Sequence, residues 1–561
     1  MSDFPAVDGA LADLAAGEKM WASAGLARRR ELLEQVHALV GEHAADWVRA
    51  ACAYKDLPVD SPLAGEEWTS GPYGVLTGAA ALISTIRALE AGRSPVDGYP
   101  LRTGPGGRVV VDVLPHTAYD RLLLSGFSAS VWIRPGVSVD EVRSRAGLGL
   151  LTPSDTHGIG AVLGAGNVTS IPVLDVFYEL YAHNRVAILK LNPITDVMLD
   201  VFSVVLAPLI DAGVLRIVTG GADVGGYLVQ HQLVSHVHLT GSAATHDAIV
   251  WGRGEEAAAR KAAGTPLLSK PVTSELGGVS PVIVLPGRWS AADLRFQAEH
   301  VATQRLHNGG YNCIASQILV ISGDWPQKDA FLDALRAVFA SAPARSSYYP
   351  GSDSRVASAC SAYPAAERFE DRVLITGLSA AGEVSALSTE YFAPVLGVLE
   401  LPGKGFLSAA VSMVNDEFIG TLGANVVASP AMLRAAGPAF DEAIAALRYG
   451  TVAVNAWTAL GFLTPTATWG AFEGHTLADV GSGIGVVHNA LLLADVERTV
   501  VRGPFRPSPR SVLGGELSLS PRPPWFVTNK TAARTGELLT SFAAHPRVSV
   551  LPGIFASAMR G

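Results

Sequence analysis

A cysteine and a glutamate in separate glycine-containing stretches are the residues of this chain best suited to covalent chemistry on a carbonyl group. Cys313 follows the stretch Asn308 to Asn312, and Glu275 precedes Leu276-Gly277-Gly278. A thiolate attacks an aldehyde readily, and a carboxylate that takes a proton from water can hydrolyse the resulting thioester. Taken singly, a cysteine is more often a small buried hydrophobic residue, and such a glutamate is often a strand end.

The composition favours a folded protein that acts on a small organic molecule. The 561 residues, 49% hydrophobic and 17% charged, are enough for two or three domains with substantial cores. The net charge of -9, without a basic stripe, argues against nucleic acid as a partner. Cys52, Cys313 and Cys360 are too few and too scattered for a disulfide framework or a zinc site.

The N-terminal region predicts neither export nor a membrane span. The first eight residues lack the basic and apolar segments of a secretory signal. The run from Trp68 to Ile86 is uncharged and about as long as a membrane span. Glycines and a proline interrupt it, which makes it a poor transmembrane helix. We expect a cytoplasmic protein, and a reducing compartment suits a nucleophilic thiol.

The pattern along the chain predicts repeated strand–helix units. Residues 26–53 place apolar residues at helical spacing and predict one amphipathic surface helix, and residues 95–150 predict strands and hairpins. Three units follow, in which a short apolar strand precedes a helix, and they predict a parallel, doubly wound sheet with a nucleotide at the carboxyl ends of its strands. Their residues are 158–163 with 172–183, 185–191 with 195–212, and 215–219 with 224–232. A second αβ region, about 280–475, opens with the buried-strand run Ser280 to Leu285.

Eight short motifs stand in the order typical of one enzyme family. They are Gly164 to Asn167, Ile188 to Lys190, Leu239 to Ser242, Glu275 to Gly278, Cys313, Glu390 to Val395, Gly450 to Asn455, and Trp469 to Ala471. On these motifs the chain resembles the aldehyde dehydrogenase superfamily, as a divergent member, over about residues 15–505. Each motif is degenerate, but their order would rarely arise by chance.

The resemblance implies an α/β fold with a Rossmann-type cofactor domain, an α/β catalytic domain and a small oligomerisation arm. It divides the chain into a cofactor-binding domain at 1–275, with a β-hairpin insertion for oligomerisation within about 95–155, and a catalytic domain at 276–475. Residues 476–561 are expected to return to the cofactor domain and to supply an oligomerisation segment and a C-terminal extension. A homodimer or homotetramer is expected, and the extension either packs on its own subunit or wraps a neighbour.

The resemblance also implies the catalytic roles. Cys313 would attack the aldehyde to give a thiohemiacetal, and Asn167 would hold its oxyanion together with the Cys313 backbone N–H. Glu275 would then activate the water that hydrolyses the thioester, and a partly dry site would raise its pKa to suit that task.

NAD or NADP is the cofactor that the resemblance implies. Lys190 would contact the adenosine ribose or its phosphate, Ser242 the pyrophosphate at a helix start, and Glu390 and Phe392 the nicotinamide ribose and ring. The full expected set is Lys190, Asn192, Gly241, Ser242, Leu276, Gly277, Glu390 and Phe392. The family's usual Lys-Pro-Ser-Glu run becomes Lys190-Leu191-Asn192-Pro193, so the acidic residue that would hold the ribose 2′-hydroxyl is missing. A 2′-phosphate would not be repelled, and both cofactors stay open.

Departures from the family pattern leave the direction of reaction open. The loop from Gly164 to Thr169 is similar to that of long-chain acyl-CoA and fatty acid reductases, and Tyr311 and His246 replace a glutamine and a glycine. One alternative is therefore an NADPH-dependent acyl-CoA or thioester reductase that forms an aldehyde. A second is a catalytically silent relative that binds a nucleotide.

The sequence assigns no definite role to two further groups of residues. His231, His236, His238 and His246 surround the Thr240 turn, but no carboxylate or cysteine joins them at ligand spacing, so no metal is expected. Trp457, Phe462 and the tail are candidates for an aromatic or aliphatic substrate tunnel, whose length and polarity the sequence does not indicate.

Overall fold

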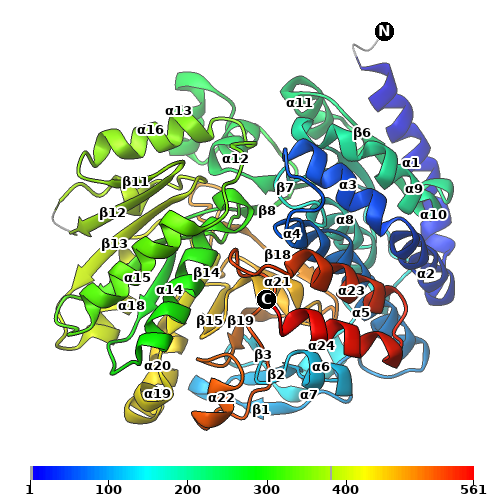
Figure 1. Cartoon of the computed structure of the whole chain (residues 1–561). Coiled ribbons are helices and arrows are strands. Elements are labelled where there is room, and N and C mark those ends of the chain that lie inside the picture. Colours follow the sequence, from blue (N-terminus) through cyan, green and yellow to red (C-terminus); the bar gives the residue numbers. More distant parts are fainter. Residues whose placement is uncertain (1–3, 380–381) are drawn as a thin grey trace.

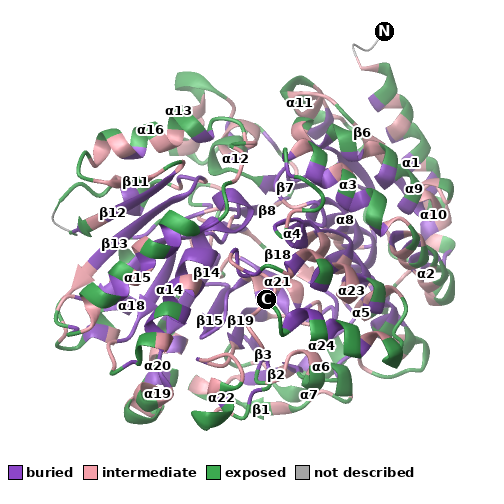
Figure 2. Cartoon of the chain, viewed as in Figure 1, coloured by how far each residue is buried: buried purple, intermediate pink, exposed green. Residues whose placement is uncertain are grey.

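The computed structural model describes residues 4–379 and 382–561. Two β-sheets lie side by side and helices cover them, with buried residues concentrated on the strands (Figures 1 and 2). Residues 1–3, at the start of the stretch in which no export signal is expected, lie outside the described residues. No described helix is both long and apolar enough to cross a bilayer.

The first sheet has six strands, of which all but the edge strand β17 are parallel. In spatial order they are β17 (Gly483–Ile484), β8 (Val272–Leu276), β7 (Val234–Gly241), β4 (Ile159–Leu163), β5 (Val186–Lys190) and β6 (Leu215–Val218). The strand–helix units expected from the sequence are confirmed.

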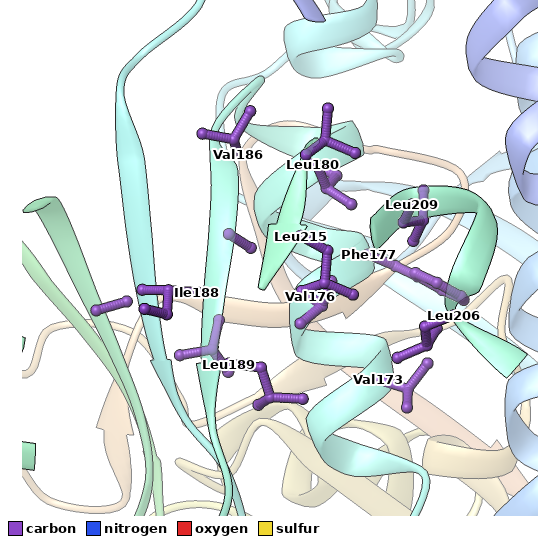
Figure 3. Packing of buried hydrophobic residues seen from close by; sticks show 14 of the residues in the cluster. Val173, Val176, Phe177, Leu180, Val186, Ile188, Leu189, Leu206, Leu209 and Leu215 are labelled. Atoms are coloured by element: carbon purple, nitrogen blue, oxygen red, sulfur yellow. The ribbon is translucent and has the colours of Figure 1, made fainter. Parts of the chain in front are cut away.

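Helices bury both faces of this parallel sheet, as its apolar strands require. Helix α1 (Pro5–Ser23) packs on β4, β5 and β6, whereas α8 (Ile171–Phe177) packs on β4 and β5. Figure 3 shows Leu215 of β6 beside Val176 of α8, whereas Ile188 of β5 points to the opposite face of the sheet, and Leu180 belongs to the π-helix η4 (Tyr178–Ala182). The other helices here are η5 (Pro193–Met198), α9 (Leu199–Val205), α10 (Ala207–Asp211), α11 (Ala222–Gln230), α12 (Ala243–Val250) and α13 (Gly254–Ala263).

The second sheet has eleven strands, with a parallel block from β19 to β12 and antiparallel strands at both ends. Its spatial order is β1 (Leu101–Thr103), β2 (Val109–Leu114), β3 (Ser128–Ile133), β19 (Val496–Arg502), β15 (Thr451–Val454), β14 (Gly423–Val427), β9 (Ser280–Val284), β10 (Ser316–Ser322), β13 (Val395–Leu401), β12 (Arg372–Leu378) and β11 (Glu367–Phe369). The hairpin region near residues 95–150 thus continues this sheet within the same chain.

Alternation along the strands fills two separate cores. Val282 and Val284 of β9 pack in the core beneath α14 (Ala291–Leu306) and α15 (Lys328–Ser341), whereas Ile283 packs in the core beneath α18 (Phe406–Asp416) and α20 (Pro438–Ala446). Other helices along the chain include α6 (Ala118–Leu123), α7 (Val139–Arg145), α16 (Ser352–Ala362), α17 (Ser385–Ser388), α19 (Pro430–Ala436), α21 (Ala459–Leu463) and α22 (Arg510–Leu513).

The N-terminal helices differ from the sequence expectation. The single surface helix expected at 26–53 is two helices, α2 (Leu26–Glu42) and α3 (Ala44–Tyr54), because His43 leaves helical geometry at φ −102 and ψ 15. Both helices also contribute to the core, since Val36 of α2 and Trp47 of α3 are fully buried. The helices α4 (Ala64–Trp68), η1 (Thr69–Tyr73) and α5 (Gly74–Glu90) follow.

The C-terminal extension packs on its own chain. Helix α23 (Ala532–Ala544) contacts α2, α4 and α5, and α24 (Leu551–Ala558) packs on α23. The contact with α4 is so close that a Cβ on Gly65 would lie 2.4 Å from the Ala532 carbonyl carbon. A small two-stranded sheet pairs β16 (Thr468–Gly470) with β18 (Val486–Asn489), which flank β17 of the first sheet in sequence.

Candidate active site

The two residues singled out for carbonyl chemistry meet where the sheets adjoin. Glu275 lies near the carboxyl end of β8, and Cys313 lies in the loop between α14 and β10. The Cys313 thiol donates a hydrogen bond to Glu275 Oε1 at 2.8 Å. Each group is thus in position to exchange a proton with the other.

Burial determines the charge state of this pair. Burial, and then the negative charge of Glu275, raise the pKa of Cys313 well above its usual value. Burial also raises the pKa of Glu275, although the hydrogen bond from Cys313 opposes the shift. The resting pair is therefore a thiol beside a carboxylate that binds protons more strongly than an exposed glutamate.

Asn167 is tied to the cysteine loop by its backbone and by its side chain. It follows β4, and its Nδ2 donates to the Tyr311 carbonyl at 2.8 Å. Its own carbonyl accepts from Asn308 Nδ2 at 3.0 Å and from Lys55 Nζ at 2.9 Å. One N–H of the Asn167 amide remains for a further acceptor beside Cys313.

A buried ion cluster under this loop has no counterpart in the sequence expectations. Lys55 Nζ lies 2.9 Å from Glu67, and both side chains are completely buried. Arg345 lies 3.1 Å from Glu66, whose Oε2 also accepts from the Asn308 backbone N–H at 3.1 Å. These charges come from α3, α4 and a distant loop, and no spacing in the sequence indicates that they meet.

The conformation of the cysteine loop requires its glycines. Gly309 and Gly310 adopt φ of +66° and +81°, and Asn308 adopts +56°. Arg305 Nη2 donates to the Gly310 carbonyl at 2.6 Å, and its Nη1 donates to the Ala315 carbonyl at 3.3 Å. The loop is thus held from α14 on one side and from the ion cluster on the other.

A cleft of about 1440 Å³ opens at the carboxyl ends of β4, β5, β7 and β8, where a nucleotide is expected. Ten of the eleven residues chosen from the sequence line it: Asn167, Lys190, Asn192, Gly241, Ser242, Glu275, Gly277, Cys313, Glu390 and Phe392. The eleventh, Leu276, packs in the core of the first sheet because successive strand residues point to opposite faces. Strand periodicity could have revealed this.

The cleft has features that fit a dinucleotide. Helix α12 begins at the cleft, with Gly241 and Ser242 at its entrance, and the Ser242 hydroxyl caps it by accepting from the Thr245 N–H at 3.2 Å. Free N–H groups at such a helix start favour a pyrophosphate. Lys190 lies at the end of β5, where burial lowers its pKa although Asp196 and Asp223 oppose this.

At the other end of the cleft a carboxylate lies against glycine backbone. A Cβ on Gly277 would lie only 1.9 Å from Glu390 Oε1, so this position cannot hold a side chain without displacing Glu390. Burial raises the pKa of Glu390 to about 7, although Arg305 opposes the shift. Phe392, two residues on, adopts φ +43°, which is unusual for a residue other than glycine.

Asn192 is positioned by a local turn. Its Oδ1 accepts from the Ile194 N–H at 3.3 Å and caps η5. A Cβ on Gly166 would lie 2.8 Å from Asn192 Cγ, so Gly166 leaves the room that this amide occupies. The position therefore presents a neutral amide to the cleft.

A second, apolar cavity also borders the thiol. Its volume is about 60 Å³, and Cys313, Glu275 and Asn167 line both this cavity and the large cleft. Its other lining side chains are mostly aromatic or aliphatic, and they include Ile171, Trp457, Leu460, Phe462, Leu463, Trp469 and Trp525. Trp525 belongs to the C-terminal extension, so that segment closes part of the cavity.

Comparisons with known proteins relate the chain to aldehyde dehydrogenases. Residues 157–353 match the model described as aldehyde dehydrogenase family. A D-glyceraldehyde dehydrogenase (NADP(+)) from Thermoplasma acidophilum is 32% identical over 113 residues, which are 20% of each chain. An N-succinylglutamate 5-semialdehyde dehydrogenase from Sphingopyxis alaskensis is 29% identical over 182 residues, 32% of this chain and 34% of the relative. The chain thus matches a fifth to a third of the length of these curated relatives.

Solved structures share the fold over most of the chain. A putative aldehyde dehydrogenase from Burkholderia cenocepacia has a TM-score of 0.58 at 19% identity, covering 89% of this chain and 91% of its own. Aldehyde dehydrogenase C from Pseudomonas syringae, in complex with NAD+ and octanal, has a TM-score of 0.59 at 16% identity and covers 90% of both chains. The α/β fold expected from the sequence is confirmed.

Proposed function

We propose that this chain, which belongs to the aldehyde dehydrogenase superfamily, oxidises an apolar aldehyde to the carboxylic acid with NAD+ or NADP+. The observation that carries the proposal is the hydrogen bond of 2.8 Å from Cys313 to Glu275. It lies where the apolar cavity and the large cleft meet, so that an aldehyde and a dinucleotide can approach one thiol from two sides.

The chemistry begins with proton transfer inside the pair. Glu275 accepts the thiol proton, and the thiolate of Cys313 attacks the aldehyde carbon to give a thiohemiacetal. The oxyanion accepts hydrogen bonds from the Asn167 amide and the Cys313 backbone N–H. A bound nicotinamide supplies the hydride acceptor. Glu275, once it has released its proton, takes another from the water that hydrolyses the thioester on Cys313.

The dinucleotide is assigned to the large cleft. Lys190 and Asn192 are assigned to the adenosine ribose, Gly241 and Ser242 to the pyrophosphate, and Glu390, Phe392 and Gly277 to the nicotinamide end. The absence of an acidic residue from the run Lys190 to Pro193 supports acceptance of a 2′-phosphate as well as a free hydroxyl. Relatives support both cofactors, since one is named an NADP(+) enzyme and another is in complex with NAD+.

An acyl-thioester reductase is the second candidate. The loop Gly164-Ala165-Gly166 before Asn167 favours it, because this loop is similar to those of acyl-CoA and fatty acid reductases. The same cysteine would receive an acyl group from a thioester, and NADPH would supply the hydride. The apolar cavity accommodates either an aldehyde or the corresponding acyl chain.

A cytoplasmic homodimer or homotetramer is part of the proposal. Support comes from the C-terminal extension, where the side chains of Leu513 and Leu517 are 85% exposed and Leu519 lies beside them at 62%. Apolar residues gathered in one exposed segment are typical of an interface. Sedimentation of the wild-type chain and of a Leu513→Ser, Leu517→Ser variant tests this, and a smaller assembly in the variant is expected.

The activity is tested by following nicotinamide absorbance with NAD+ and with NADP+ against a series of aliphatic and aromatic aldehydes, with Cys313→Ala as the control. Turnover that depends on Cys313 is expected. Reduction of acyl-CoA without aldehyde oxidation would instead identify the thioester reductase. Failure of both reactions would identify a silent relative.

A further inference from the structure

A stripe of polar side chains runs along the first sheet from Glu275 towards the amino ends of its strands. His236, His238 and Thr240 alternate along β7 and therefore share one face. On β8, Thr273 pairs with His238, and Glu275 pairs with Thr240. Polar groups buried in a core are costly unless they are hydrogen-bonded, so the partners of this stripe matter.

The helix that covers this face supplies two carboxylates. Asp175 and Glu179 are four residues apart along α8 and η4 and point to the same side. Glu179 Oε1 lies 3.0 Å from His236 Nδ1. Asp175 Oδ2 accepts from the Thr240 hydroxyl at 3.0 Å and lies 3.5 Å from His238 Nε2.

The contacts between these groups are continuous. His238 Nε2 lies 3.3 Å from Thr240 Oγ1, and His238 Nδ1 lies 2.9 Å from Thr273 Oγ1. Thr273 Oγ1 is in turn 3.3 Å from His236 Nε2, which completes the path to Glu179. In both His238 and His236, one ring nitrogen faces the group nearer Glu275 and the other faces the group nearer Glu179.

The two ends of the path differ in exposure. At the inner end, Thr240 and Glu275 occupy paired positions on adjacent strands, which lie about 4.8 Å apart. At the outer end, Arg185 donates to Glu179 Oε2 at 3.0 Å, and both Arg185 and His183 are partly exposed. The path thus leads from Thr240, the strand neighbour of the buried Glu275, to the surface.

We infer that this stripe is a proton relay, in which His238, Thr273 and His236 carry protons from Glu275 to the surface at Arg185. The inference rests on the proposed function. In each turnover Glu275 receives a proton twice, first from the Cys313 thiol and then from the attacking water, and the thiolate freed by hydrolysis takes one proton back. Glu275 is only 1% exposed and must discharge the first proton before it can accept the second.

The transfer conserves atoms and charge at each step. Glu275 gives its proton to Thr240 Oγ1 while the Thr240 hydroxyl proton moves to His238 Nε2, and His238 then carries a positive charge beside the Asp175 carboxylate. His238 Nδ1 gives its proton to Thr273 Oγ1 while the Thr273 hydroxyl proton moves to His236 Nε2. One proton advances, no charge remains on threonine, and His236 gives its proton to solvent water beside Glu179, where Arg185 is partly exposed.

The charges along the path support this direction. Although burial opposes it, Asp175, with Glu179 and Glu275, raises the pKa of His238, so this imidazole accepts a proton readily. Burial opposes the ionisation of both carboxylates. Even so, His238 and His488 lower the pKa of Asp175 to about 2. His236 and Arg185 likewise lower the pKa of Glu179 to about 2. Both carboxylates therefore remain counter-ions.

An activated ester tests the relay without any nicotinamide. 4-Nitrophenyl acetate acylates a reactive cysteine and releases 4-nitrophenolate in a burst, and the later steady rate reports hydrolysis of the thioester. Acylation leaves the thiol proton on Glu275, so the relay acts between the burst and the steady phase. The full-length protein is used throughout.

Thr273→Val, which keeps the shape but removes the hydroxyl, is expected to retain the burst and to lower the steady rate about tenfold or more. Thr273→Ser is expected to restore the rate, and His238→Gln is expected to behave like the valine variant. A larger solvent deuterium isotope effect on the steady rate is expected in both slow variants. His300→Gln, another buried histidine outside the stripe, is the control and should match the wild type.

Wild-type steady rates in Thr273→Val and His238→Gln would overturn the relay. Equal losses of burst and steady rate, accompanied by a lower unfolding temperature, would also overturn it, because they indicate a packing role. A burst in a wild-type protein that oxidises no aldehyde would refute the proposed function while the variants still decide the relay. The absence of any burst would overturn both proposals.

Discussion

The Sγ atom of Cys313 and the Oε1 atom of Glu275 lie 2.8 Å apart although 38 positions separate them. Glu275 belongs to the first sheet, whereas Cys313 lies in the loop before β10 of the second. Their distance depends on how β8 of the first sheet meets the loop before β10 of the second. The same junction places the thiol at the inner ends of the apolar cavity and the large cleft. The chemistry proposed for this chain therefore depends on the contact between its two sheets.

Glu275→Gln is expected to lower steady-state aldehyde oxidation by about 10² to 10⁴-fold, because the general base for hydrolysis is lost. The first turnover should be slowed less than hydrolysis. Glutamine cannot accept the thiol proton, but the change also removes a negative charge that, after burial, raises the pKa of Cys313. Rapid-mixing measurements of nicotinamide reduction check both phases. A variant that loses its first turnover to the same extent as its steady rate would contradict the role of Glu275 as the base for hydrolysis. If the chain also reduces thioesters, that reaction should change little in Glu275→Gln.

The pH dependence of the steady rate should also report the ionisation of Glu275. Because burial raises the pKa of Glu275 above the ordinary 4.5, its base form is present above that raised value and is lost as the pH falls through it. The wild-type steady rate should therefore fall on the acid side at a higher pH than an ordinary glutamate would give. Glu275→Gln should lack this decline, and an unchanged acid limb would assign it to another group.

Glu390 should make cofactor binding sensitive to pH near neutrality. Its pKa of about 7 means that the carboxylate, which accepts hydrogen bonds from a ribose, is lost as the pH falls through 7. The KM for the dinucleotide is expected to rise roughly tenfold between pH 8 and pH 6. In Glu390→Gln the KM should be high and independent of pH. Fluorescence titration with the dinucleotide checks this, and a flat wild-type profile would contradict it.

Trp525→Ala should widen substrate choice, because this side chain of the C-terminal extension lines the apolar cavity. We expect kcat/KM for longer or bulkier apolar aldehydes to rise by about tenfold relative to short ones. Phe526→Leu is the matched control, since Phe526 stacks on Phe296 and His300 instead of lining that cavity. An aldehyde series with both variants checks this, and equal effects of the two would indicate general loosening of the extension.

Lys55→Met should destabilise the protein and impair catalysis together. The change leaves Glu67 buried without its closest cation, and such losses cost about 3–5 kcal/mol. It also removes a donor to the Asn167 carbonyl, so kcat should fall more than the affinity for the dinucleotide. Lys404→Met, at an exposed lysine, is the control for stability. Denaturant unfolding and steady-state kinetics check these effects, and a stable, fully active Lys55→Met would contradict them.

Much of the fold follows from local pattern. Buried strands such as Ser280–Val284 and the alternating strand–helix units lie where apolar periodicity places them, because a parallel sheet needs apolar residues on both faces. The same periodicity argument locates Leu276 in the core between two cleft residues. The break at His43 was not predictable from the pattern, since the apolar stripe continues across it.

The sequence alone determined which residues could react, because the types and the order of Asn167, Glu275 and Cys313 can be recognised without a structure. Only the tertiary structure decided what surrounds them. Lys55 under the cysteine loop, Trp525 in the apolar cavity and Asp175 above His238 come from segments far apart in the chain. Such contacts arise when many elements pack together, and burial then sets the pKa values, so no local spacing encodes them.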